Sequence, residues 1–229
     1  VETEPSDGIL PRPVPFSVVY EDDDILVVDK PADTPIHPSI GNYENTLANG
    51  IAWYFEQKGE RFVYRCINRL DRDTTGLIVL AKHALSAAVL SQAMRSREIH
   101  RTYQAFALGE TAASGTIDAP IARLDGSLIQ RTVDFASGER SVTHYRTLAH
   151  CSGFSHLELS LETGRTHQIR VHMAYIGHPL LGDTLYNKTP GTFPRQALHS
   201  ASLSFVHPIT GEPLNFHAPL PEDMQNLLT

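Results

Sequence analysis

Apolar and polar residues alternate, or form short apolar runs, along most of the chain, and both patterns predict β-strands. The clearest alternation lies in residues 155–164, where Leu157, Leu159 and Leu161 share one face of an extended chain. The turn-forming segment HPITGEP joins the last two strand-like segments. Strands are predicted at residues 16–20, 24–30, 64–68, 77–81, 101–109, 141–149, 155–164, 201–206 and 213–218.

Three other segments have the apolar spacing of helices. In the second of them Leu85, Val89 and Ala93 recur every fourth residue, as on one face of a helix. In the third, Gly177 stands where a glycine commonly ends a helix. Helices are predicted at residues 46–55, 83–97 and 165–177.

Many strands with few inserted helices, and no strict alternation of the two, are typical of an α+β fold. We expect a mixed, mostly antiparallel central sheet flanked by helices and loops. Residues 16–229 are expected to form one domain. Residues 1–15 are rich in proline and polar side chains, which predicts an extended leader.

Composition and charge narrow the class of protein. Of 229 residues, 41% are hydrophobic and 20% charged, which is an ordinary globular composition. The apolar runs are far shorter than the roughly 18–20 residues of a membrane span. Two cysteines are too few for a disulfide framework, so a reducing cytoplasm is expected.

The net charge of −7 conceals a basic stretch in the middle of the chain. Residues 61–101 carry eight basic side chains, seven of them arginine, against three acidic ones. Arginine binds phosphate with a planar fork of donors and stacks on bases, so this stretch favours a nucleic-acid contact. A solvent-exposed face with ion pairs is the alternative, and charge alone does not separate the two.

Common cofactor and metal motifs do not occur in the sequence. It has no glycine-rich phosphate loop, no dinucleotide fingerprint and no Gly-x-Ser-x-Gly segment. His167 and His172 lie about 140° apart around a helix, which does not suit a shared metal. Neither a cofactor nor a metal is therefore expected.

Carboxylates among arginines remain as candidate chemistry. Asp71 lies in the segment NRLDRDTTG between two predicted strands, where loops commonly present functional groups. Its neighbours Arg69 and Arg72 favour the ionised carboxylate, which could act as a nucleophile. The alternative is structural: Asp71 and Asp73 bridge arginines and cap the loop.

Several segments, taken in order, resemble the RluA family of RNA pseudouridine synthases. INRLDRDTTG resembles that family's HRLDxxTSG signature, and DILVVDKPADTPIHPS resembles its entry segment. RTYQAF resembles its tyrosine strand, and SVTHYRTL a further strand. LETGRTHQIRVHMAYIGHPLLGDTLY and ALHSASLSFVHPITGEPLNFHAPLP follow its third motif and closing segment.

The resemblance implies that residues 16–229 form a pseudouridine synthase catalytic domain, which isomerises uridine to pseudouridine in RNA without a cofactor. It implies that Asp71 is the catalytic nucleophile, that Tyr103 stacks on the target base and that Arg170 pairs with the catalytic aspartate. Further residues are expected to bind the substrate: Arg69, Arg72, Arg165, Ile169 and Leu198.

Three positions depart from the family pattern. Asn68 replaces the usual histidine, Thr75 a serine and Asp33 a glycine. Asparagine hydrogen-bonds but does not titrate, and aspartate tolerates a left-handed turn, so the mechanism is expected to survive.

The expected partner is RNA. Ribosomal RNA is favoured over transfer RNA because the leader resembles the tether that follows a small N-terminal RNA-binding domain in ribosomal-RNA enzymes; a short leader of a single-domain enzyme is the alternative. A monomer is expected. A non-catalytic RNA-binding protein with this fold is the main alternative. A glycosidase that uses Asp71 and Asp73 as its carboxylate pair is a weaker one.

Overall fold

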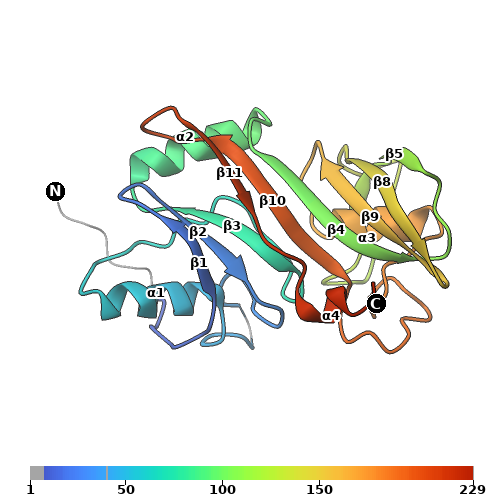
Figure 1. The fold of residues 1–229 in the computed structure, drawn as a ribbon, viewed down its shortest axis with the longest axis horizontal. Coiled ribbons are helices and arrows are strands. Elements are labelled where there is room, and N and C mark those ends of the chain that lie inside the picture. The colour runs from blue at the N-terminus through green and yellow to red at the C-terminus, as the bar shows by residue number, and fades with distance from the viewer. Residues whose placement is uncertain (1–7, 40, 229) are drawn as a thin grey trace. The chain divides into compact units, whose positions relative to one another are not determined.

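The computed structural model describes residues 8–39 and 41–228 of the chain (Figure 1). Contacts divide these residues into two compact units. Unit 1 contains the described residues up to Ile99 together with Ser202–Ala218; unit 2 contains His100–Ala201 and the described residues from Pro219 onward. Residues 1–7 of the predicted leader lie outside the described residues, and the domain boundaries expected from the sequence stay a prediction.

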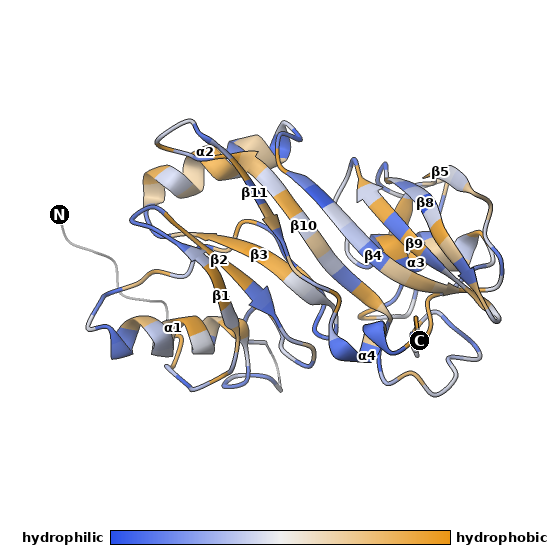
Figure 2. Ribbon diagram, viewed as in Figure 1, coloured by the Kyte–Doolittle hydropathy of each residue, from blue (hydrophilic) through white to orange (hydrophobic). Residues whose placement is uncertain are grey.

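Unit 1 is built on strands that are buried on both faces. β3 is buried along its whole length, and Val79 in it lies opposite Val27 of the neighbouring antiparallel strand β2. Leu90 and Leu203 complete this core, and β3 is hydrophobic along most of its length in Figure 2. The elements of unit 1 are β1 (Ser17–Glu21), β2 (Ile25–Lys30), α1 (Leu47–Gln57), β3 (Thr75–Ala81), α2 (Ala84–Arg95), the end of β10 (Leu198–Val206) and β11 (Pro213–His217).

Helix α1 begins at a reciprocal cap. The Thr46 hydroxyl accepts a hydrogen bond from the Asn49 N–H, and the Asn49 side-chain oxygen accepts one from the Thr46 N–H. The Asn49 amide group also donates to the carbonyl oxygen of Leu10. A Cβ added to Gly50 would lie 2.6 Å from the carbonyl oxygen of Val14. The end of the predicted leader therefore packs directly against α1.

The predicted second helix is confirmed as α2, but its regular apolar stripe does not face the core. Leu85 and Val89 are 64% and 39% exposed, whereas Ser86 and Leu90 are fully buried. Only Ala93 of the stripe packs against the core cluster. The periodicity predicts the helix correctly, but the buried residues Ser86 and Leu90 each follow a residue of the apolar stripe by one position.

The strand predicted at residues 64–68 is wrong as an element. Cys66 makes a single isolated bridge to Leu80 of β3. Beyond it, the Asn68 side chain bonds the edge of β3: its amide N–H donates to the Leu77 carbonyl (3.1 Å), and its oxygen accepts from the Val79 N–H (2.9 Å). A side chain thus replaces the backbone ladder at this point.

Unit 2 contains an antiparallel sheet in the order β4-β9-β8-β5. In β9 the predicted alternation holds at Leu157 and Leu159, which are buried, whereas Leu161 is partly exposed. The short elements β5, β6, β7 and α4 were not predicted. The elements are β4 (His100–Leu108), β5 (Ser114–Asp118), β6 (Ile121–Arg123), β7 (Arg131–Val133), β8 (Val142–Cys151), β9 (Phe154–Leu161), α3 (Gln168–Tyr175), the start of β10 and α4 (Glu222–Gln225).

Helix α3 ends as the sequence predicts. Gly177 has φ +86°, and the N–H groups of Gly177 and His178 donate to the carbonyls of Ala174 and Met173. This pair of bonds is the Schellman pattern, which satisfies carbonyls at the end of a helix. The fixed end matters because α3 carries two of the predicted site residues.

The α+β class is confirmed, with a mostly antiparallel sheet and few helices. Among the described residues, no helix has the length and apolar character needed to cross a membrane.

Candidate active site

Asp71 lies in a loop that leads into β3. Its side chain is half-buried, and its carbonyl oxygen accepts a hydrogen bond from the Thr74 N–H (3.1 Å) across a tight turn. On the N-terminal side Asn68 bonds the edge of β3, and on the C-terminal side β3 begins at Thr75. The loop that carries Asp71 is therefore anchored to the sheet at both ends.

Lys30 anchors the middle of this loop. It is the last residue of β2, is fully buried, and its ammonium group donates to the carbonyls of Pro31 (2.7 Å), Thr34 (2.9 Å) and Arg72 (2.7 Å). The Thr34 N–H also donates to the Arg72 carbonyl (3.1 Å). Lys30 was not predicted as a site residue. The sequence feature that could have identified it is a lysine at the end of a strand whose first four residues are apolar.

Within the loop, Asp73 forms an ion pair with the neighbouring Arg72. Asp73 accepts hydrogen bonds from the guanidinium of Arg72, the shortest at 3.0 Å, and Arg72 also lies 3.6 Å from Asp33. These contacts raise the pKa of Arg72, chiefly through its hydrogen bond to Asp73. Asp33 has φ +52°, the left-handed conformation expected for it.

The basic stretch divides into two groups. Arg65 donates to backbone carbonyls and Lys82 binds Glu21, so these two cations hold the protein itself together. Arg61 and Arg69 are exposed. Ion pairing therefore accounts for Lys82, although its side chain is 14% exposed and does not form the solvent-exposed face considered from the sequence.

Unit 2 contains the other predicted site residues. Tyr103 in β4 is 4% exposed and lies opposite Leu159 of β9. Ile169 and Leu198 are also buried, whereas Arg165 forms an ion pair with Glu139 on the surface. Arg69, Asp71 and Arg72 belong to unit 1.

Arg170 in α3 is buried and held by a carboxylate. Its Nε and Nη2 donate to Asp183 at 2.7 and 2.9 Å. Tyr186 lies over the guanidinium, with 5.1 Å between Cζ and the ring centroid. Neither Asp183 nor Tyr186 was predicted as a site residue, although both stand in the segment GDTLY of the third motif.

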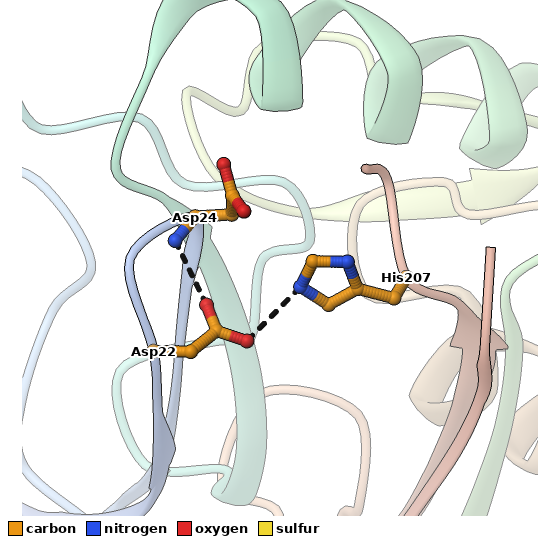
Figure 3. Close-up of side chains that lie close together, drawn as sticks. All are labelled: Asp22, Asp24 and His207. Carbon is orange, nitrogen blue, oxygen red and sulfur yellow. Dashed lines mark hydrogen bonds and ion pairs between the residues drawn. The ribbon is translucent and has the colours of Figure 1, made fainter. Parts of the chain in front are cut away.

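A cluster of possible metal ligands also lies in unit 1, formed by Asp22, Asp24 and His207 (Figure 3). His207 Nδ1 accepts from the N–H groups of Ile209 and Thr210, so its proton lies on Nε2 and is donated to Asp22 (3.0 Å). A metal ion bound to Nε2 would have to displace that proton, and the Asp22 carboxylate would then lose its hydrogen bond from His207. The hydrogen bonding indicates that this cluster ties together two turns rather than holding a metal.

Hydrogen bonds also determine the charge of Asp22. Burial would raise its pKa, but hydrogen bonds from Ile25 N–H, the Tyr20 hydroxyl, Asp24 N–H and His207 outweigh burial and lower it. The carboxylate is thus satisfied by the protein alone.

Solved structures and sequence relatives agree on the class of protein. The human structure titled RNA Pseudouridylate Synthase Domain Containing 1 matches with a TM-score of 0.75 and 26% identity over 95% of this chain and 86% of that chain. Residues 24–175 match the family described as RNA pseudouridylate synthase. The chain belongs to this family, as its motifs suggested, and is an isomerase.

Two curated relatives show how similar the sequences are. The chain is 44% identical over 228 residues to the Bacillus subtilis protein named uncharacterized RNA pseudouridine synthase YjbO, covering 99% of this chain and 80% of that protein. It is 41% identical over 232 residues to ribosomal large subunit pseudouridine synthase D of Escherichia coli K12, covering 95% and 71%.

Proposed function

We propose that this enzyme converts specific uridines of ribosomal RNA to pseudouridine, with Asp71 as its nucleophile. The observation that carries the proposal is the setting of Asp71: a half-buried carboxylate on a loop bonded to the sheet through Asn68 and Lys30. A nucleophile held in one geometry reacts with less loss of entropy than one on a mobile loop.

The reaction needs no outside reagent. The bond from ribose C1′ to N1 of the base breaks, the base turns, and C1′ bonds to C5 of the same base. The proton on C5 leaves, and N1 gains one, so atoms and electrons balance. Asp71 attacks either the sugar or C6 of the base and is released when the product forms, or it promotes a route through a glycal.

The other predicted residues supply binding and orientation in this proposal. Tyr103 stacks on the base, a contact typically worth about 1–3 kcal/mol, which offsets part of the few kcal/mol needed to unstack a base from RNA. Arg170 pairs with the Asp71 carboxylate and orients it. Ile169 and Leu198 form apolar walls beside the base, and the arginines at 69, 72 and 165 contact RNA phosphates.

Ribosomal RNA is the preferred substrate because ribosomal large subunit pseudouridine synthases are among the similar proteins, at 41–44% identity. Transfer RNA is the alternative substrate. We further propose that the enzyme acts as a monomer in the cytoplasm.

Pseudouridine mapping in the source organism tests the proposal. Total RNA is compared between the parent, a strain that lacks the gene, and that strain carrying the wild-type gene or Asp71→Asn. We expect ribosomal pseudouridines to vanish on deletion and to return only with the wild-type gene. Loss of sites in transfer RNA instead would contradict the substrate, and return of the sites with Asp71→Asn would contradict the nucleophile and favour a non-catalytic role.

A further inference from the structure

The turn after α3 closes on the guanidinium of Arg170. Asp183 is fully buried and bonds that guanidinium through both carboxylate oxygens. One of these oxygens, Oδ1, also accepts the N–H groups of Leu185 (3.0 Å) and Tyr186 (3.2 Å). The same carboxylate therefore shapes the turn and holds the arginine.

Tyr186 links this turn to the start of α3. Its ring covers the guanidinium, and its hydroxyl bonds His167 Nδ1 (2.7 Å) and the Arg131 N–H (2.9 Å). His167 precedes the first residue of α3 and has φ +58°, a left-handed conformation that costs a non-glycine residue about 1–3 kcal/mol. A strained helix start and a fixed guanidinium are thus held by one side chain.

The orientation of the pair has a chemical consequence. Asp183 binds the edge of the guanidinium formed by Nε and Nη2, so the donors of Nη1 lie outside this pair. A long, flexible arginine is thereby held in one orientation before a substrate arrives, which is how enzymes reduce the entropic cost of ordering a catalytic group.

We propose that Asp183 is the positioning residue of this enzyme: it fixes the orientation of the Arg170 guanidinium before a substrate binds, with Tyr186 as its second support. The inference rests on the proposed function, in which Arg170 pairs with Asp71. An ion pair that only stabilises the fold is the competing explanation.

The chain offers a matched control for that explanation. Arg195 and Asp223 form a second two-pronged pair in unit 2, at 2.8 and 2.9 Å, with Arg195 buried and lying over the ring of Phe193. Asp223→Asn breaks a pair of the same chemistry at a place to which no catalytic role is assigned.

The test measures single-turnover release of tritium from RNA labelled at uracil C5, with folded enzyme counted by the stoichiometry of RNA binding. We expect Asp183→Asn to lower the rate about 100-fold while RNA affinity stays within about threefold. Asp223→Asn is expected to lower the melting temperature but to keep the rate within about threefold. In an Arg170→Lys background, Asp183→Asn should lower the rate by less than about threefold, because its effect passes through the arginine.

Equal rates for Asp183→Asn and Asp223→Asn, or the same loss in both backgrounds, would overturn the inference. If Asp183→Asn does not fold, the wild-type enzyme supplies a second measurement, the exchange of the Arg170 Nε–H with water by NMR. Slow exchange is expected, and exchange as fast as that of an exposed arginine would refute a fixed guanidinium. If wild-type enzyme releases no tritium, the proposed function fails, whereas the exchange experiment still reports on Arg170.

Discussion

Replacing Lys30 tests whether the Asp71 loop depends on one buried ammonium group. Lys30→Met keeps a long, unbranched side chain but removes the donors to the carbonyls of Pro31, Thr34 and Arg72. All three carbonyls lose this donor, but the Arg72 carbonyl keeps its bond from the Thr34 N–H, so the Pro31 and Thr34 carbonyls are the two that become unsatisfied. At about 1–3 kcal/mol for each unsatisfied buried group, the loss would be about 2–6 kcal/mol.

Removing the ammonium group also removes the cost of burying its charge, which offsets part of this loss. We therefore expect Lys30→Met to lower the free energy of unfolding by about 3 kcal/mol, measured by urea denaturation. Hydrogen exchange should also speed up at the Thr34 and Thr74 amides, whose bonds hold the loop.

Lys82→Met is the matched control. Lys82 is 14% exposed and binds Glu21 and the Asp22 carbonyl, away from the Asp71 loop. We expect it to lose about 1 kcal/mol and to leave exchange in the loop unchanged. If Lys30→Met lost no more stability than Lys82→Met, or left loop exchange unchanged, the anchoring role of Lys30 would be refuted.

Three further predictions concern burial and close packing. Burial lowers the pKa of His172 below its ordinary 6.5, so as pH falls the unfolded chain takes up the proton first and stability declines below about pH 6.5. In urea unfolding between pH 7.5 and 5.5, the free energy of unfolding of His172→Gln should therefore decline less steeply with falling pH than that of wild type. An equally steep decline in both proteins would contradict this prediction. Burial raises the pKa of Cys66 to about 12, so iodoacetamide at pH 8 should modify Cys151 well before Cys66, and equal rates would be inconsistent with the buried thiol. Gly50→Ala should destabilise the protein by about 1–3 kcal/mol in thermal unfolding because its Cβ meets the Val14 carbonyl, whereas a stabilised variant would show that the leader does not pack there.

The sequence pattern was sufficient for elements whose local signals agree with their environment. Residues 25–28 of β2 and 77–81 of β3 are continuous apolar runs because both strands are buried on two faces there. Gly177 marks the end of α3 because the left-handed conformation completes the cap. The regular stripe of Leu85 and Val89 misled because periodicity shows that a helix forms, not which side the core occupies.

Other features depend on contacts between distant residues and leave little local signal. β6 and β7 have three residues each and exist because Ile121 pairs with Val133. The bond of Asp183 to Arg170 spans thirteen residues and needs the intervening turn. The motif resemblance pointed to Arg170 and to the catalytic aspartate as its partner, but gave no reason to select Asp183.

The most direct test of the proposed nucleophile is tritium release from RNA labelled at uracil C5, measured with purified wild-type enzyme, Asp71→Asn and Asp73→Asn. Asparagine is nearly isosteric with aspartate but is not a nucleophile, and Asp73, two residues away, pairs with the exposed side chain of Arg72. The proposed mechanism predicts full release by wild type, release within about tenfold of wild type by Asp73→Asn, and none detectable by Asp71→Asn. Release by Asp71→Asn at the wild-type rate would contradict it.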